Sequence, residues 1–169
     1  MKYTETDFEI RRIRPEEGDA IVTIEHTCFP PGMAETREAL LKRVLLVSEL
    51  FEVAVEKSSG KVVGYLNGVS TAREHFSDDF FSDFSQYDES GRNVMLLGLA
   101  VLPEYRGRGI ARALMMHYQE TQKECGREKL FLTCLEGKVE MYRNMNFKDL
   151  GMADSAWGGQ IWHEMMCEL

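Results

Sequence analysis

Residues 106–111, RGRGIA, bring two arginines and two glycines together directly before a helix-forming segment. Glycine allows backbone N–H groups to approach a ligand that a Cβ atom would keep away. The first turn of a helix adds N–H donors without helical acceptors and the positive end of the helix dipole. This combination suits a pyrophosphate group. The alternative is an ordinary surface turn in which both arginines are solvated.

Two other phosphate-binding patterns do not fit these residues. The spacing is not GxxxxGK followed by Ser or Thr, and no GxGxxG with a later ribose-binding acid is present. A nucleoside triphosphate and a dinucleotide are therefore weak candidates for the ligand.

The segments on either side of the glycines must position them. An apolar run at residues 95–102, MLLGLAVL, stops at Pro103, and residues 110–126 favour a helix. The predicted order is strand, turn, helix, with the glycines where the strand has ended and the helix begins.

The motif and its flanks together resemble the acyl-coenzyme A loop of the GNAT acetyltransferase superfamily. The superfamily pattern is Gln or Arg, two residues, Gly, one residue, and Gly or Ala, and Arg106, Gly109 and Ala111 fill it. The resemblance implies acetyl-coenzyme A as co-substrate, with backbone groups of the preceding strand pairing with its pantetheine arm. The implied cofactor-binding residues are Leu99, Ala100, Val101, Arg106, Gly107, Arg108, Gly109, Ile110 and Ala111.

The C-terminal half is similar to the arylalkylamine (serotonin) N-acetyltransferase branch of that superfamily. The similar segments are LTC at 132–134, MYRNMNF at 141–147 and WHEM at 162–165. A CF-x-P-like first loop and a long insertion before the central strand also match. The branch implies direct attack of a primary amine, small and aromatic or hydrophobic, on the thioester.

The loop CFPPGM at residues 28–33 is a candidate wall of the substrate pocket. Loops on a rigid scaffold often carry binding residues. Phe29, Pro30 and Met33 are therefore the candidate substrate-binding residues. The alternative, with equal weight, is a helix breaker that carries two core anchors.

Tyr142 matches the tyrosine with which the family protonates the coenzyme A thiolate. A phenol, with a pKa near 10, is a better proton donor to a thiolate of pKa about 8.5 than a solvated carboxylate is. The resemblance therefore implies that Tyr142 is the general acid. The alternative is a core tyrosine that packs beside Phe147.

The proton acceptor is where the sequence departs from the branch. Vertebrate members carry two histidines in the central strand, and the matching positions here are Met95 and Leu97, which cannot accept a proton. Either another group or a water chain must do this work. Glu25 in the first helix is the leading candidate, against the alternative of a solvated glutamate, and His26 lies about 100° further around the helix. The remaining histidines, His75, His117 and His163, are isolated in sequence and are expected to be structural.

Composition indicates one globular domain spanning residues 1–169. The chain is 44% hydrophobic and 28% charged, which is ordinary for a globular protein. Its four cysteines are far apart, so we expect no metal site and no disulfide framework. The net charge of −8 argues against nucleic acid. No apolar run approaches the roughly 20 residues that a bilayer requires, so we expect a cytoplasmic protein without a membrane partner; a homodimer stays open.

The coarse order of elements predicts an α+β protein. Strands are expected near residues 8–13, 51–57, 62–70, 129–134, 148–152 and 158–169, in addition to the central one, and helices near 15–29, 34–48 and 136–147, in addition to 110–126. Leu40, Leu41, Val44, Leu45 and Val47 form the expected inner stripe of the second helix. The order resembles the GNAT fold, one strongly twisted mixed sheet of about seven strands with about four helices.

Two further functions stay open beside the acetylation of a small hydrophobic amine. The first keeps the reaction but takes a polyamine, an aminoglycoside or a protein amine, which the acidic and aromatic insertion at residues 71–92 would suit. The second is a non-catalytic acyl-coenzyme A sensor, which the loss of the two histidines allows. A donor at Tyr142 favours the enzyme, because a sensor needs no acid beside the sulfur.

Overall fold

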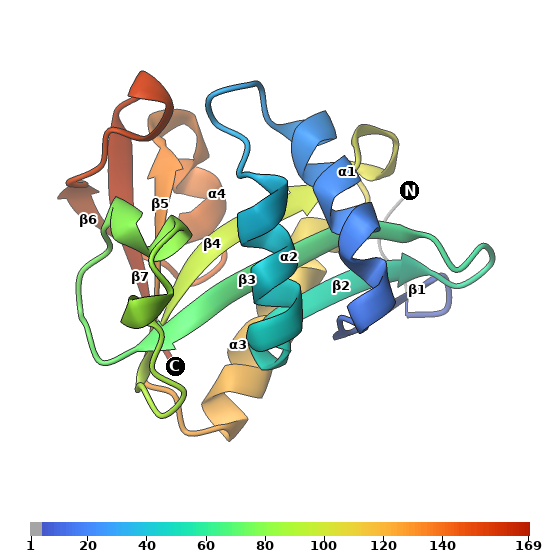
Figure 1. The fold of residues 1–169 in the computed structure, drawn as a ribbon, viewed down its shortest axis with the longest axis horizontal. Coiled ribbons are helices and arrows are strands. Elements are labelled where there is room, and N and C mark those ends of the chain that lie inside the picture. Colours follow the sequence, from blue (N-terminus) through green and yellow to red (C-terminus); the bar gives the residue numbers. More distant parts are fainter. Residues whose placement is uncertain (1–4) are drawn as a thin grey trace. The chain divides into compact units, whose positions relative to one another are not determined.

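The computed structural model describes residues 5–169 and confirms the α+β class (Figure 1). Within these residues seven strands follow the hydrogen-bonded order β1-β2-β3-β4-β5-β7-β6, and four α-helices accompany them. β4 and β5 are parallel, whereas β1–β2, β2–β3, β5–β7 and β6–β7 are antiparallel, so the sheet is mixed. The elements are β1 (Phe8–Arg12), α1 (Gly18–Cys28), α2 (Arg37–Leu46), β2 (Phe51–Glu56), β3 (Val62–Thr71), β4 (Asn93–Val101), α3 (Ile110–Glu124), β5 (Lys129–Leu135), α4 (Val139–Arg143), β6 (Lys148–Met152) and β7 (Trp162–Glu168).

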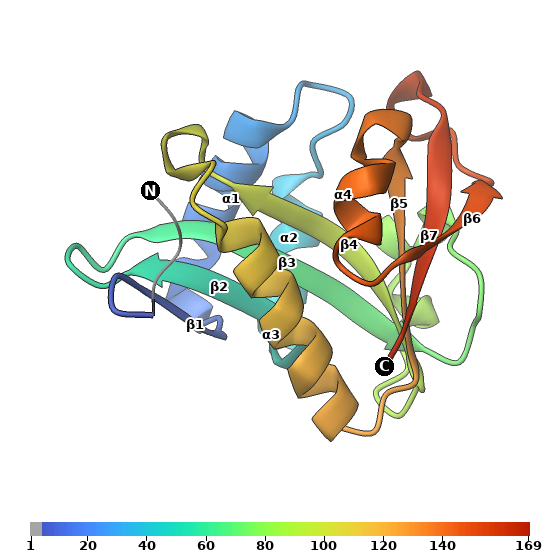
Figure 2. The same cartoon turned by 180° about the vertical axis from the view of Figure 1, so that it is seen from behind.

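The chain forms two compact units, which are described separately. The first contains the described residues up to Asn67 together with Gly98–Tyr118, and the second contains Gly68–Leu97 together with Gln119–Leu169. In the first unit, α1 and α2 lie over one face of the β2–β3 hairpin (Figure 1), and the first part of α3 lies over the opposite face (Figure 2). None of the helices within residues 5–169 is long and apolar enough to cross a bilayer.

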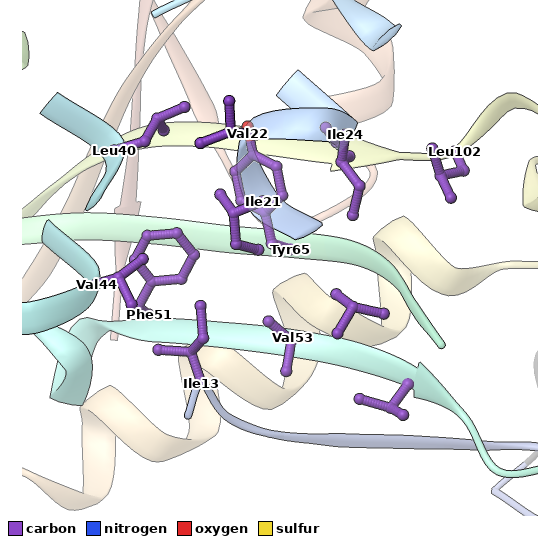
Figure 3. Close-up of a cluster of buried hydrophobic side chains, with 13 residues drawn as sticks. Ile13, Ile21, Val22, Ile24, Leu40, Val44, Phe51, Val53, Tyr65 and Leu102 are labelled. Atoms are coloured by element: carbon purple, nitrogen blue, oxygen red, sulfur yellow. The ribbon is translucent and has the colours of Figure 1, made fainter. Parts of the chain in front are cut away.

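The core of the first unit lies between the sheet and the helices α1 and α2 (Figure 3). Ile21 and Ile24 of α1 and Val53 of β2 are almost completely buried there. In α2 the buried positions are 40, 43 and 44, and Val47, the residue that caps the helix, is buried as well; the positions follow helical spacing but include a charged residue, Arg43. Because Arg43 takes this place on the inner face, the prediction for Leu45 is wrong: that side chain is 66% exposed.

The second unit is built on β5, β7 and β6, and α4 follows β5 along the chain (Figure 2). The insertion at residues 72–92 contains two short 3-10 helices and is attached to the loop between β6 and β7. Asp78 accepts hydrogen bonds from the Ser155 hydroxyl (2.6 Å) and the Ala156 N–H (3.2 Å). Phe81 stacks on Trp157 with ring centroids 4.4 Å apart. The insertion is thus an ordered part of this unit.

A buried carboxylate in β2 makes the stability of the fold depend on pH. Glu52 is 6% exposed, its Oε1 lies 3.1 Å from Nδ1 of His117, and burial raises its pKa to about 7. A carboxyl with a raised pKa contributes stability that is complete below its unfolded pKa and is lost as the pH rises through the folded value. As the pH rises from about 5 to about 8, the parent protein should therefore lose stability that Glu52→Gln keeps. The free energy of unfolding of Glu52→Gln relative to the parent should rise by on the order of 2 kcal/mol over this range.

Urea unfolding at the two pH values measures this gain. Glu38→Gln, at an exposed position in the first turn of α2, is the control for removing a carboxylate that is not buried. A pH-independent difference between Glu52→Gln and the parent protein would contradict the raised pKa.

Candidate functional site

The RGRGIA turn has the backbone that its glycines predict. Gly107 and Gly109 have φ angles of +77° and +83°, a region that side chains with a Cβ atom rarely adopt. The first helical hydrogen bond of α3 runs from the Ala113 N–H to the Gly109 carbonyl at 3.0 Å. The N–H groups of Ile110 and Ala111 therefore have no acceptor in the helix itself. The turn offers backbone donors at the positive end of a 15-residue helix.

Both arginines of the turn are held by neighbouring groups. The Nε of Arg106 donates to the carbonyl of Val101 at 3.0 Å. The guanidinium of Arg108 lies over the ring of Tyr105, 5.0 Å from its centroid. These contacts fix two positive charges beside the helix start, which favours an anionic ligand.

The last residues of β4 divide into two sets by the direction of their backbone groups. The Leu102 N–H donates to the Val63 carbonyl in β3 at 2.9 Å. Directions alternate along a strand, so Ala100 also faces β3, whereas Leu99 and Val101 face away. The Val101 carbonyl already accepts from Arg106 and from the Cys28 thiol. The groups suited to an external partner are those of Leu99 and the N–H of Val101.

The pairing between β4 and β5 is short. It covers Asn93–Lys129, Val94–Leu130 and Met95–Phe131 and then ends, although both strands continue. Leu96 and Leu97 consequently have no β5 partner in this ladder. Backbone groups of a central strand that lack a ladder partner are suited to pair with an extended ligand.

Glu25, the predicted proton acceptor, is buried rather than solvated. It is 3% exposed, and its Oε1 accepts a hydrogen bond from the hydroxyl of Tyr65 in β3. Its Oε2 accepts from the backbone N–H of Glu35 at 2.8 Å. Both carboxylate oxygens thus already have a donor, and Tyr65 is the side chain bound to this group.

A wider polar network continues from Glu25, and the sequence analysis did not find it. Arg43 forms an ion pair with Glu35 and donates from Nη1 to Oδ1 of Asn67 at 2.7 Å. All four side chains of Glu25, Glu35, Arg43 and Asn67 are at most 4% exposed. Burial raises the pKa of Glu35 to about 7, against the lowering effect of Arg43. The signal in the sequence was Arg43, which shares helical spacing with Leu40, Val44 and Val47.

Glu35, near the end of the loop between α1 and α2, ties this loop back to α1 through both of its backbone groups. The Nε2 of His26 lies 3.0 Å from the Glu35 carbonyl, and the Glu35 N–H donates to Glu25. His26 is therefore engaged in holding the loop. Phe29 packs partly against the core of the first unit, as the alternative of a core anchor predicts, whereas Pro30 is exposed and Met33 is partly exposed.

Tyr142 lies in α4, in the second unit. Its neighbours are compatible both with a general acid and with a core tyrosine. Its ring contacts Phe147 edge to face, with centroids 5.8 Å apart. The side chain is partly exposed as a whole, yet burial of its polar end, with a smaller effect of Cys134, raises its pKa above the usual range. The hydroxyl therefore keeps its proton at every pH near neutrality. A group that is always protonated suits a proton donor.

The other histidines lie beside carboxylates. His163 Nδ1 is 3.2 Å from both oxygens of Asp149, His117 pairs with Glu52, and His75 is 3.8 Å from Glu164. Within residues 5–169, no group of three or more His, Cys, Asp and Glu side chains is arranged to hold a metal ion.

In the first unit, the structure brings together several of the residues predicted from the sequence. The Cys28 thiol, the Arg106 guanidinium and the Val101 carbonyl meet at one point, which joins the end of α1 to the end of β4 and to the RGRGIA turn. Comparison with known sequence families adds that the sequence pattern described as acetyltransferase (GNAT) family matches residues 19–147. The chain belongs to the GNAT family. A search of curated proteins found no match.

Solved structures of GNAT proteins share the fold of this chain. A GNAT-like decarboxylase, GphF, in complex with isobutyryl-CoA, has a TM-score of 0.80 and 18% identity, over 95% of this chain and 98% of that one. The paiA N-acetyltransferase from Thermoplasma acidophilum, in complex with coenzyme A, has a TM-score of 0.70 and 16% identity, over 96% and 99%. A putative acetyltransferase, yncA, from Salmonella typhimurium with acetyl-CoA has a TM-score of 0.68 and 17% identity, over 96% and 94%. At these identities the likeness establishes the fold.

Proposed function

We propose that this GNAT protein transfers the acetyl group of acetyl-coenzyme A to the primary amine of a small aromatic or hydrophobic compound. The observation that carries the proposal is the RGRGIA turn, with positive φ angles at Gly107 and Gly109 directly before α3. The named relatives add support, since two of them are described with acetyl-CoA or coenzyme A bound.

The residues of the turn fit the pyrophosphate of this co-substrate. Among residues 5–169, no atom would lie within 4 Å of a Cβ atom built on Gly107, so the space beside the backbone there is open to a ligand. In the proposal the N–H groups of residues 106–111 bind the phosphates, with Arg106 and Arg108 adding positive charge. The backbone groups of Leu99 and the N–H of Val101 pair with the pantetheine amides. The co-substrate itself supplies the activated thioester.

The acid and base of the proposed reaction are Tyr142 and Glu25. The amine must be neutral to attack, and the departing sulfur must gain a proton. Tyr142 donates that proton. Glu25 receives the proton that the amine loses. It thereby does the work of the two histidines that vertebrate members of the resembled branch carry at the positions of Met95 and Leu97.

The acidic insertion gives little support to a polycationic substrate. Asp83 accepts from Ser85, Asp88 accepts from Ser90, and Asp78 holds Ser155. These carboxylates therefore organise turns and contacts of their own. Phe76 and Phe80 are buried inside the same unit, whereas Phe81 is partly exposed.

A panel of amines offered with acetyl-coenzyme A tests the proposal. Thiol release and the mass of the acetylated product are measured for a phenylalkylamine, a polyamine, an aminoglycoside and a peptide with a free amino group. We expect the phenylalkylamine to have the highest kcat/KM. Preference for one of the other amines would overturn the substrate class, and tight coenzyme A binding without transfer to any amine would establish the sensor.

A further inference from the structure

Glu35 attaches the loop between α1 and α2 to both of these helices (Figure 1). Its backbone N–H donates to Glu25 at 2.8 Å, and its carbonyl lies 3.0 Å from Nε2 of His26, both in α1. Its side chain forms an ion pair with Arg43 in α2. Residues 29–34, which precede it, are all partly or fully exposed. The buried attachment at this end of the loop is therefore Glu35.

The side chain of this attachment is a buried acid with incomplete pairing. Glu35 is 4% exposed and Arg43 is 1% exposed. Arg43 binds Oε1 of the carboxylate, whereas Oε2 is shielded from solvent and has no hydrogen-bond partner within residues 5–169. An unsatisfied buried acceptor costs on the order of 1–3 kcal/mol, and more where it carries charge. A proton on this carboxyl removes the charge, so the buried position favours the neutral acid.

The charged groups around Glu35 leave an excess of negative charge when the carboxyl is ionised. Arg43 from α2 is the cation, and it also donates to Asn67 of β3. Glu25 from α1 is a second carboxylate. It accepts from the hydroxyl of Tyr65 in β3, whose raised pKa keeps it neutral, and the remaining titratable neighbour, His26, contacts the backbone carbonyl only. One guanidinium thus faces two carboxylates.

The affinity of Glu35 for a proton differs between the closed loop and an open one. In the closed loop, burial, opposed by Arg43 and supported by Glu25, raises the pKa of Glu35 to about 7. Once the loop opens and the carboxyl is solvated, its pKa returns to about 4.3, the ordinary value for glutamate. The closed loop therefore binds this proton more tightly than the open loop does.

We propose that Glu35 is a pH-sensitive latch, which holds the α1–α2 loop closed when its side chain is protonated and loosens the loop when the side chain is ionised. A group that binds a proton more tightly in the closed state stabilises that state. The stabilisation is complete below the pKa of the open state, about 4, and is lost as the pH rises through that of the closed state, about 7.

The proposal goes beyond acetyl transfer, because it concerns the motion of the loop itself. This loop carries Phe29, Pro30 and Met33, the candidate substrate-binding residues. Loosening of the latch would therefore change the part of the first unit that we expect to meet the amine.

Hydrogen exchange of the loop amides tests the latch in the protein without substrate. The protection factor of the residue 35 N–H reports local opening, and in the parent protein it should fall by roughly 10²-fold between pH about 5 and about 8. Glu35→Gln keeps the backbone contacts and cannot ionise, so its protection should stay constant over this range. Glu38→Gln, at an exposed position of α2, is the matched control and should follow the parent protein.

Equal pH dependence in the parent protein and in Glu35→Gln would overturn the proposal, as would protection in the parent that does not change with pH. If Glu35→Gln does not fold, the carbon-13 resonance of the Glu35 carboxyl in the parent protein decides. It should titrate near pH 7, and titration near the ordinary value of about 4.3 would overturn the latch. None of these measurements uses acetyl transfer, so failure of the latch and failure of the proposed function are distinguished.

Discussion

The Tyr142→Phe variant is expected to lose kcat by roughly 10²- to 10⁴-fold, the range typical of a missing general acid. The substitution keeps the ring and therefore its edge-to-face contact with Phe147. Thermal unfolding should change little for that reason. The KM for acetyl-coenzyme A should also change little, because in the proposed mechanism the hydroxyl acts after the amine has attacked. Steady-state kinetics of thiol release, with a good amine substrate, measure both constants.

The pH dependence of the same reaction provides a second measurement. Because the pKa of Tyr142 is raised above the usual range, the parent enzyme should show no loss of kcat from this group as the pH rises to about 9. The Tyr118→Phe variant is the control for deletion of a hydroxyl. Near-normal kcat in a folded Tyr142→Phe protein, or a loss confined to stability, would assign Tyr142 to core packing alone.

Gly109→Val is expected to weaken coenzyme A binding by at least about 10-fold while the protein stays folded, since a branched side chain at a positive φ distorts the turn proposed to bind the phosphates. Gly60, in the turn between β2 and β3, has a φ of +73° and open space where a Cβ would lie. Gly60→Val therefore carries comparable backbone strain, on the order of 1–3 kcal/mol, at a site with no proposed ligand.

Isothermal titration with coenzyme A and urea unfolding separate the two effects. Both variants should lose stability to a similar degree, and only Gly109→Val should lose affinity. Unchanged affinity in Gly109→Val, or an equal loss in both, would exclude the turn as the phosphate site.

Local patterns in the sequence predicted the elements that carry the turn. The predicted strand at residues 95–102 is the last part of β4, which ends at Val101, and α3 begins at Ile110. Between them, Gly107 and Gly109 adopt positive φ angles. Asn146, at the end of the segment that holds Tyr142, also has a positive φ, +75°, which asparagine adopts more readily than most residues with a side chain. Each of these features depends on residues a few positions apart, so a single sequence contains the information.

The contacts of Glu25 could not be predicted from the sequence, because they join residues that are far apart along the chain. Tyr65 is 40 positions from Glu25, and Asn67 is 24 positions from Arg43. Nothing in the spacing of these residues indicates that β3 and two helices bring them together. The error at Leu45 has the same origin, since periodicity assigns apolar residues to the inner face and here a buried ion pair includes Arg43.

Both backbone groups of Glu35 are bound to side chains of α1, so the end of the loop between α1 and α2 is fixed independently of its tip. His26 and Glu25 fix the two ends of the loop at its base, so α1 and α2 keep their anchors whatever sequence lies between them. Pro30 and Gly32, at the exposed tip, make no contribution to the buried core. Residues 30, 31 and 33 are thus expected to tolerate substitution without loss of these anchors, whereas Gly32, with a φ of +90°, is expected to resist it.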